Sequence, residues 1–102
     1  MSGYVVCVTF VVDPASAVPF LDAMMEQASN SLALEDGCSQ FDVCVDPDDP
    51  ARIFLYEIYD DRAAFDLHLA SDHFLTFDAA TRDWVKDKQV TTWHRNQGLT
   101  SS

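Results

Sequence analysis

The chain has 102 residues, of which 17 are acidic and 6 are lysine or arginine, so its formal net charge is −11. This length fits a single domain, and 48% hydrophobic residues suffice for a core that needs no disulfide or metal support. The acidic excess disfavours nucleic acids and anionic membrane surfaces as partners, because carboxylates repel phosphate groups. The expected partner is therefore a small organic molecule.

The cysteines and the start of the chain point to a reducing compartment. An odd number of cysteines without a Cys-x-x-Cys pair does not indicate a disulfide framework, so free thiols are expected at Cys7, Cys38 and Cys44. No basic segment followed by an apolar run and a cleavage site opens the chain, and no apolar stretch reaches the ~18 residues of a membrane helix. We therefore expect a cytoplasmic protein without a membrane segment.

The first elements predicted along the chain are a strand and a helix. Residues Tyr4 to Val12 are rich in valine and phenylalanine and carry apolar side chains at both odd and even positions. This is typical of a strand that is covered on both faces. Asp13-Pro14 ends this run, and apolar residues then recur every three or four positions from Ala15 onward. We expect Gly37 to end the helix in a left-handed conformation. The expected buried stripe is Val18, Leu21, Met25, Ala28 and Leu32, widened by Phe20 and Met24.

Two further strands are expected to form a hairpin. Residues Cys38 to Val45 alternate between apolar and polar side chains, which indicates a strand. The segment from Asp46 to Pro50 contains two prolines and is expected to turn the chain rather than continue the ladder. The apolar run from Arg52 to Tyr59 should then return antiparallel to the first of these strands.

The second half is expected to contain a broken helix and a last strand. Asp60-Asp61 can cap a short helix over Arg62 to Ala70, and Ser71 can cap another over Asp72 to Val85. Residues Gln89 to Arg95 alternate again, as a strand does. We therefore expect one domain over residues 1–96, followed by a polar tail over residues 97–102.

This order predicts an α+β fold of the ferredoxin-like type, β-α-β-β-α-β, with an antiparallel sheet and its helices on one face. The first and third predicted strands carry apolar side chains at both odd and even positions. The sheet face without helices would therefore be a large exposed apolar surface. The simplest cover is a second copy of the chain. We therefore expect a homodimer in which the two sheets pack face to face.

The polar residues that draw attention lie within apolar sequence. A carboxylate at Glu57, in mid-strand, needs a partner or a raised pKa, and Arg52, Arg95 or a backbone amide could supply the partner. His68 and His73 flank the break at Ser71, which could turn both imidazoles into one cleft and give a proton-transfer pair. Either a catalytic or a structural role remains open for these three residues.

Other candidates are an amide, an aromatic wall and a metal ion. Asn30 could hydrogen-bond a ligand from the predicted helix, and Phe54, Phe74 and Trp93 could line an aromatic pocket. Both histidines with Glu57 or Asp72 could make a two-histidine, one-carboxylate iron site. Their spacing matches no recognised ligand signature, so we expect no metal.

Several short motifs in this order resemble the antibiotic biosynthesis monooxygenase domain family, especially its quinol monooxygenases and the autoinducer-2-degrading protein. The motifs are Glu35-Asp36-Gly37-Cys38, Phe41-Asp42-Val43, Leu55-Tyr56-Glu57-Ile58-Tyr59-Asp60-Asp61, Ala63-Ala64-Phe65, His68 and Ser71-Asp72-His73-Phe74. The resemblance covers nearly the whole chain. It implies a dimeric α/β barrel with a pocket between sheet and helices in each protomer.

The resemblance also implies an activity. Family members oxidise phenols or quinols with molecular oxygen and need no flavin, metal or haem, so no cofactor is expected. The matching positions imply catalytic roles for Glu57, His68 and His73, with Asn30 and Tyr56 as donors to a developing oxyanion. Some relatives have a helix asparagine nine residues before the turn glycine, a position that Ala28 occupies here, so Asn30 is out of register. Haem-degrading relatives have an asparagine in the first strand and a tryptophan in the helix before the histidine. The first strand here has no such asparagine, and Phe65 stands before His68 instead of tryptophan, so haem cleavage is not expected.

Three functions follow as hypotheses. The first is a cofactor-independent monooxygenase that acts on a small phenol or quinol. The second is an isomerase of a phosphorylated dione, which needs a cation in the pocket from one of Arg52, Arg62, Arg82, Lys86, Lys88 and Arg95. The third is a non-catalytic dimeric ligand-binding module, which a purely apolar pocket with solvent-facing histidines would favour.

Overall fold

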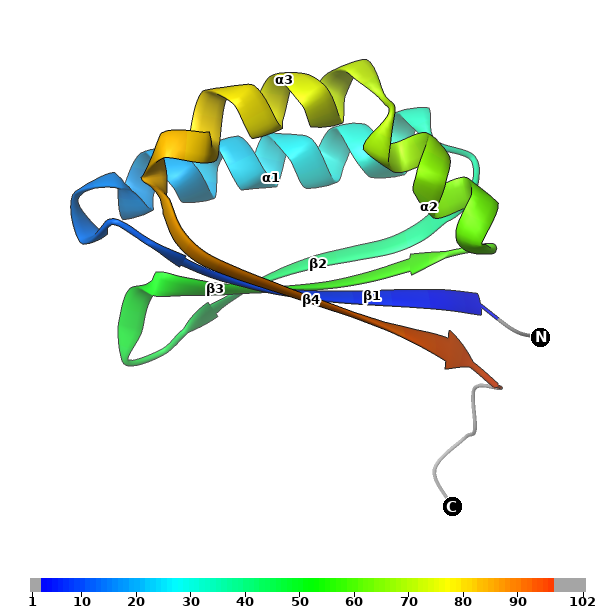
Figure 1. Cartoon of the computed structure of the whole chain (residues 1–102), viewed down its shortest axis with the longest axis horizontal. Helices are drawn as coiled ribbons and strands as arrows, with labels where there is room; N and C mark the ends of the chain where they lie inside the picture. Colours follow the sequence, from blue (N-terminus) through cyan, green and yellow to red (C-terminus); the bar gives the residue numbers. More distant parts are fainter. Residues whose placement is uncertain (1–2, 97–102) are drawn as a thin grey trace.

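The computed structural model describes residues 3–96, which form a four-stranded antiparallel sheet with its helices on one face (Figure 1). The strand order is β2 (Cys38–Asp46), β3 (Asp49–Tyr59), β1 (Gly3–Val12) and β4 (Val85–Arg95), so the first and third strands lie in the centre. This arrangement confirms the predicted ferredoxin-like fold. The polar tail expected over residues 97–102 lies outside the described residues. No helix within residues 3–96 has the length and apolar character that crossing a membrane requires.

The strands and helices follow the expected order with shifted boundaries. The helices α2 and α3 meet at the expected break, but α3 ends at Thr81 in a short 3-10 turn rather than continuing to Val85. The last strand begins at Val85, before the expected Gln89. The elements are β1 (Gly3–Val12), α1 (Ala17–Leu34), β2 (Cys38–Asp46), β3 (Asp49–Tyr59), α2 (Arg62–Leu69), α3 (Asp72–Thr81) and β4 (Val85–Arg95), with 3-10 turns η1 (Pro14–Ser16) and η2 (Arg82–Trp84).

The core lies between the sheet and the helices, and strand register selects the residues that enter it. Successive side chains of a strand point to opposite faces, so Val6, Val8 and Phe10 of β1 share the face that the helices cover. Leu55 of β3 stands directly opposite Val8 and is also buried. The Phe20 ring of α1 packs edge-on against Phe10, with ring centroids 5.1 Å apart. The register therefore decides which side chains can line a site between the layers.

The predicted buried stripe of the first helix is wrong by part of a turn. Val18 is 72% exposed, and Met25 and Leu32 are exposed as well. Phe20, Met24 and Ala28 are buried as expected, and the other residues that α1 buries are Ala17, Gln27 and Ser31. Apolar spacing alone could not separate these two overlapping stripes, because the face that meets the sheet includes two polar residues. This rotation places two polar residues, Gln27 and Ser31, on the buried side of α1.

Gly37 does not adopt the expected left-handed conformation, because no glycine within residues 3–96 has a positive φ. The helix instead ends at Leu34, and the C-cap residue Glu35 has an extended backbone. A Cβ atom at position 37 would lie 2.6 Å from the Cβ of Ala64 in α2. Glycine is therefore required here by the close approach of α2 to the α1–β2 connection, which places α2 over the end of α1.

The hairpin between β2 and β3 is tighter than expected. Asp46 pairs with Asp49, so the chain reverses over Pro47 and Asp48, and Pro50 lies inside β3. The expectation that the whole segment from Asp46 to Pro50 would leave the ladder is therefore wrong. Proline is tolerated at this position because it lies near the start of β3.

The other face of the sheet carries no helix (Figure 1). Side chains of β1, β3 and β4 share this face in register, with Phe54 opposite Thr9 and Trp93 opposite Val5. Trp93 is 60% exposed, and Phe54 is exposed as well. The uncovered apolar surface that the sequence predicted is therefore present in the protomer.

Candidate active site

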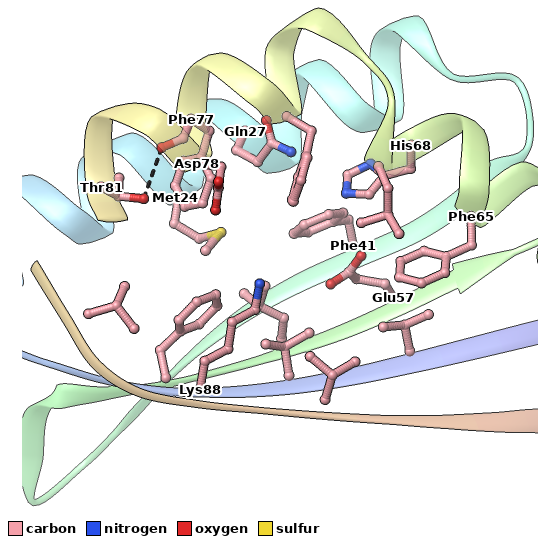
Figure 2. Close-up of a pocket in the computed structure, with 18 of the residues that line it drawn as sticks. Met24, Gln27, Phe41, Glu57, Phe65, His68, Phe77, Asp78, Thr81 and Lys88 are labelled. Atoms are coloured by element: carbon pink, nitrogen blue, oxygen red, sulfur yellow. Dashed lines mark hydrogen bonds between the residues drawn. The ribbon is translucent and has the colours of Figure 1, made fainter. Parts of the chain in front are cut away.

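A cavity of about 410 Å³ lies between the inner face of the sheet and the three helices (Figure 2). This volume is in the range of small-molecule sites. Most of its wall is apolar or aromatic and includes Val8, Phe10, Met24, Phe41, Leu55, Phe65, Phe74 and Phe77. The polar or charged wall residues are Gln27, Glu57, His68, Asp78, Thr81, Arg82 and Lys88. An apolar chamber with a few polar groups suits a small aromatic ligand.

His68 and His73 meet at one carboxylate rather than in the cavity together. Nδ1 of His68 lies 2.8 Å from Oε2 of Glu35, and Nε2 of His73 lies 2.5 Å from the same oxygen. The two imidazole ring centroids are 6.1 Å apart. Only His68 borders the cavity, whereas His73 borders a groove on the outer side of the helices. Glu35 therefore links an inner and an outer histidine.

The break between α2 and α3 brings these histidines to Glu35. The Oγ of Ser71 donates a hydrogen bond to the carbonyl oxygen of His68 at 2.7 Å, and it accepts one from the backbone N–H of Phe74 at 3.3 Å. Ser71 thus binds the last turn of α2 through His68 and also caps the N-terminus of α3. Without this bend, side chains five positions apart would point away from each other on a helix.

Glu35 was not recognised as a functional residue from the sequence. It lies at the C-terminal end of α1, where the chain leaves the helix with an extended backbone, and its N–H still donates to the Ser31 carbonyl. Its position within the Glu35-Asp36-Gly37-Cys38 motif was visible, but its partners lie 33 and 38 residues away in the chain. Spacing along the chain therefore gave no signal for this contact.

Burial controls the protonation of His68. The residue is buried, and loss of solvent lowers the pKa of its imidazole below the ordinary value. The hydrogen bond and negative charge of Glu35 act in the opposite direction and favour the imidazolium, but they do not outweigh burial. Because a carboxylate can only accept, Nδ1 carries the hydrogen in this contact. Nε2 of the neutral ring is then a free base.

Glu57 is 3% exposed and borders the same cavity from β3. The hydroxyl of Tyr59 donates to its Oε1 at 2.5 Å, so its partner is a tyrosine rather than the expected Arg52, Arg95 or backbone amide. Burial raises the pKa of Glu57 to about 7, although the Tyr59 hydrogen bond and the charge of Lys88 lower it. The cavity therefore holds a histidine whose pKa is lowered and a carboxyl group whose pKa is raised, as is often found for acid–base pairs in enzymes.

The same residues could also hold a cation. Glu35, His68 and His73 each offer a ligand atom, and these atoms lie within 4.8 Å of one another. This is a two-histidine, one-carboxylate set, but with Glu35 in place of the Glu57 or Asp72 considered from the sequence. Without a cation, the same short contacts of both imidazole rings to one Glu35 oxygen are hydrogen bonds that join the three residues.

The remaining predicted site residues are divided among three places. Phe74 borders the cavity, whereas Asn30 lies beside His73 at the outer groove. The structure places Phe54, Tyr56 and Trp93 at a hollow on the uncovered face of the sheet, so none of them reaches this protomer's cavity. Strand alternation could have shown that Tyr56 and Glu57 do not belong to the same site, because adjacent residues of a strand face opposite sides of the sheet.

The cysteines differ in environment. Cys38 is buried, and burial raises the pKa of its thiol to about 11, assisted by the charges of Glu35 and Glu57. Cys44 is exposed, and Cys7 is intermediate in burial. None of the three borders the cavity, so no thiol is available in its wall.

Comparison with known proteins agrees with this geometry. The family model for antibiotic biosynthesis monooxygenase matches residues 3–80. This chain belongs to the antibiotic biosynthesis monooxygenase family. The match includes Glu35, Glu57, His68 and His73, whereas the whole of β4 lies beyond it. A search of curated proteins finds no match.

Solved structures show the same fold as this family member. A candidate antibiotic biosynthesis monooxygenase from Nitrosomonas europaea is 28% identical, with a TM-score of 0.85 over 89% of this chain and 88% of that chain. A protein from Shewanella oneidensis is also 28% identical, with a TM-score of 0.80 over 90% of each chain. Another candidate antibiotic biosynthesis monooxygenase, from Bacteroides thetaiotaomicron, is 24% identical, with a TM-score of 0.89 over 98% of this chain and 96% of that one.

Proposed function

We propose that this family member is a monooxygenase that oxidises a small phenol or quinol with molecular oxygen and needs no flavin, metal or haem. The observation that carries the proposal is the placement of His68, which is buried, hydrogen-bonded through Nδ1 to Glu35 and in contact with an apolar cavity. Family membership and the 28% identical candidate monooxygenase support the reaction class.

The chemistry begins with a proton transfer. Nε2 of His68 takes the proton of a substrate hydroxyl, and the resulting phenolate is electron-rich enough to give electrons to oxygen. Glu35 fixes the ring so that Nε2 is the free nitrogen, and its negative charge stabilises the imidazolium that forms. His68 is the proposed base, and Glu35 is a positioning residue behind it. His73 shares that carboxylate oxygen and helps to hold it in place.

The oxygen step balances without an external reductant. For hydroquinone, the ring gives four electrons to one O₂ molecule, and the products are hydroxy-1,4-benzoquinone and one water. One oxygen atom forms the new C–O bond, and cleavage of the O–O bond sends the other into water. Glu57 retains its proton up to about pH 7, so it can supply a proton to the departing oxygen. The Tyr59 hydroxyl holds its carboxyl group in place.

The proposal includes a homodimer. The outer face of the sheet presents apolar side chains, among them Phe54 and Trp93, without a covering layer in the protomer. Two such faces could pack together as sheets do in a sandwich, about 10 Å apart. The dimer would bury the hollow that Phe54, Tyr56 and Trp93 border.

The experiment is oxygen consumption in a panel of hydroquinones, naphthohydroquinones and simple phenols, with chelator present and flavin absent. The wild-type chain should consume oxygen with at least one of them. His68→Asn should lose roughly 10²- to 10⁴-fold in kcat/KM, the usual contribution of a general base. His94→Asn is the matched control, because His94 is exposed and lies outside the cavity. Equal rates for His68→Asn and wild type would contradict the proposal.

An isomerase of a phosphorylated dione is the second candidate, because its requirement for a cation is met. Arg82 and Lys88 both border the cavity. This reaction also starts with proton removal by a base, so His68 would keep its role. Conversion of such a dione without oxygen would select this candidate. The condition set for a non-catalytic module is not met, since the cavity has polar groups and His68 is buried.

A further inference from the structure

Lys88 places a positive charge in the wall of the cavity. It lies on the inner face of β4, directly opposite Phe10 of β1. Its Nζ is 5.4 Å from the ring centroid of Phe10 and 6.0 Å from that of Phe74. Figure 2 shows its ammonium end rising from the sheet into the cavity, on the same side as the Glu57 carboxylate. Two aromatic faces thus hold this ammonium group beside the space a ligand would fill.

Lys88 differs from the other cations of the chain. Three arginines form carboxylate pairs, which are Arg52 with Asp46, Arg62 with Asp66 and Arg82 with Asp78. Within residues 3–96, Lys88 is in no salt bridge and donates no side-chain hydrogen bond. Lys86 and Arg95 do not border the cavity. Among the described residues, Lys88 is therefore the cation in this wall that forms no salt bridge, and the carboxyl group on which its charge acts is that of Glu57 in the same wall.

The electrostatic setting favours an anionic group at this point. The chain has a net charge of −11, so an anionic ligand is repelled at long range and needs a local positive charge to bind. Lys88 itself is exposed on β4, but the wall beside its ammonium is apolar, so a ligand that covers this point would shield the ion contact from water and strengthen it. A single ammonium balances one negative charge, as a carboxylate carries.

We propose that the cavity selects an aromatic ligand bearing a carboxylate, and that Lys88 binds this carboxylate while the ring lies among the aromatic side chains. Placing a ring hydroxyl at His68 rests on the proposed function, whereas the carboxylate contact does not. Lys88 is thus a specificity-determining residue, and the substrate class is a hydroxylated aromatic acid. Arg82 borders the same cavity but is engaged by Asp78 at 2.9 Å.

The test compares a matched pair of ligands, 2,5-dihydroxybenzoate and 2,5-dihydroxybenzamide, by calorimetry without oxygen at pH 7. The wild-type chain should bind the acid about tenfold more tightly than the amide, as a charge-assisted hydrogen bond allows. Lys88→Met keeps the length of the side chain and should bring the ratio of the two affinities near one. Lys88→Arg should keep the preference, which guards against a folding defect. Lys86→Met is the matched control and should behave as wild type.

Three results would overturn the inference: no preference in wild type, an unchanged preference in Lys88→Met, or an equal loss in Lys86→Met. Absence of acid binding by wild type counts as no preference. Failure of the proposed function has a different signature, because it would leave the acid preference intact while no ligand supported oxygen consumption. Turnover of neutral hydroquinones without any acid preference would instead retain the function and remove this inference.

Discussion

Glu57→Gln should remove a pH-dependent destabilisation of the folded protein. The pKa of Glu57 is about 7 in the folded chain against an ordinary value of 4.5, chiefly because burial disfavours its charged form. Glutamine has nearly the same shape and keeps an oxygen that can accept the Tyr59 hydrogen bond. The substitution therefore isolates the charge.

The sign and size follow from proton linkage. Between these two pKa values the folded state binds more protons than the unfolded state, so the wild-type chain loses stability as the pH rises from about 4.5 to about 7. Each pKa unit corresponds to about 1.36 kcal/mol, which gives a loss of roughly 2.5 kcal/mol between pH 5 and pH 8. The Glu57→Gln variant should therefore gain about this much on wild type over that interval, a relative rise in Tm on the order of 10 °C.

The assay is urea unfolding of both proteins at pH 5 and pH 8, with thermal unfolding as a second probe. Glu26→Gln is the matched control, because Glu26 is exposed on α1 and should show no comparable change. His68 contributes equally to wild type and variant, so it cancels in the difference. A Glu57→Gln effect that is the same at both pH values would refute the reasoning.

Three other predictions concern the packing, the base and the assembly. Gly37→Ala should destabilise by about 1–3 kcal/mol through overpacking against Ala64, and Ala64→Gly in the same chain should recover part of the loss, which a double-mutant cycle in urea would measure. If the two effects simply add, the contact is not the cause. Glu35→Gln should lower kcat/KM on the order of 10²-fold and move the acid limb of its pH profile to lower pH, because Glu35 raises the pKa of His68; a shift to higher pH contradicts this role. Trp93→Asp should convert a dimer to a monomer in sedimentation, whereas Leu67→Asp, at an exposed position on α2, should not; a dimer that persists in Trp93→Asp would place the interface elsewhere.

Much of the fold could be predicted because several independent local signals agreed. The alternation in β2, the acidic cap before α2 and the serine cap before α3 each identify an element by its own chemistry, and their order specifies the topology. The face of α1 could not be predicted in this way. Its buried side includes Gln27 and Ser31, so the apolar pattern pointed partly to solvent.

The site was predictable only where sequence position determines direction. The break at Ser71 indicated that both histidines would face one cleft; their rings do lie 6.1 Å apart, but only His68 borders the cavity. Burial of Glu57 followed from its place in the strand. The shared partner Glu35 could not be inferred, because the contact joins the end of α1 to α2 and α3, which are distant from it in the chain. Lys88 lies on an edge strand whose inner face is partly open, and only the packed structure shows that this face borders a cavity.

The fate of the two oxygen atoms tests the central claim most directly. The protein would be incubated with a turned-over hydroquinone under ¹⁸O₂ in the presence of chelator, and product and water would be analysed by mass spectrometry at early times. The account predicts one labelled atom in the hydroxyquinone, the other in water, and loss of both in His68→Asn. An unlabelled quinone accompanied by hydrogen peroxide would instead show oxidation without oxygen transfer, and would contradict it.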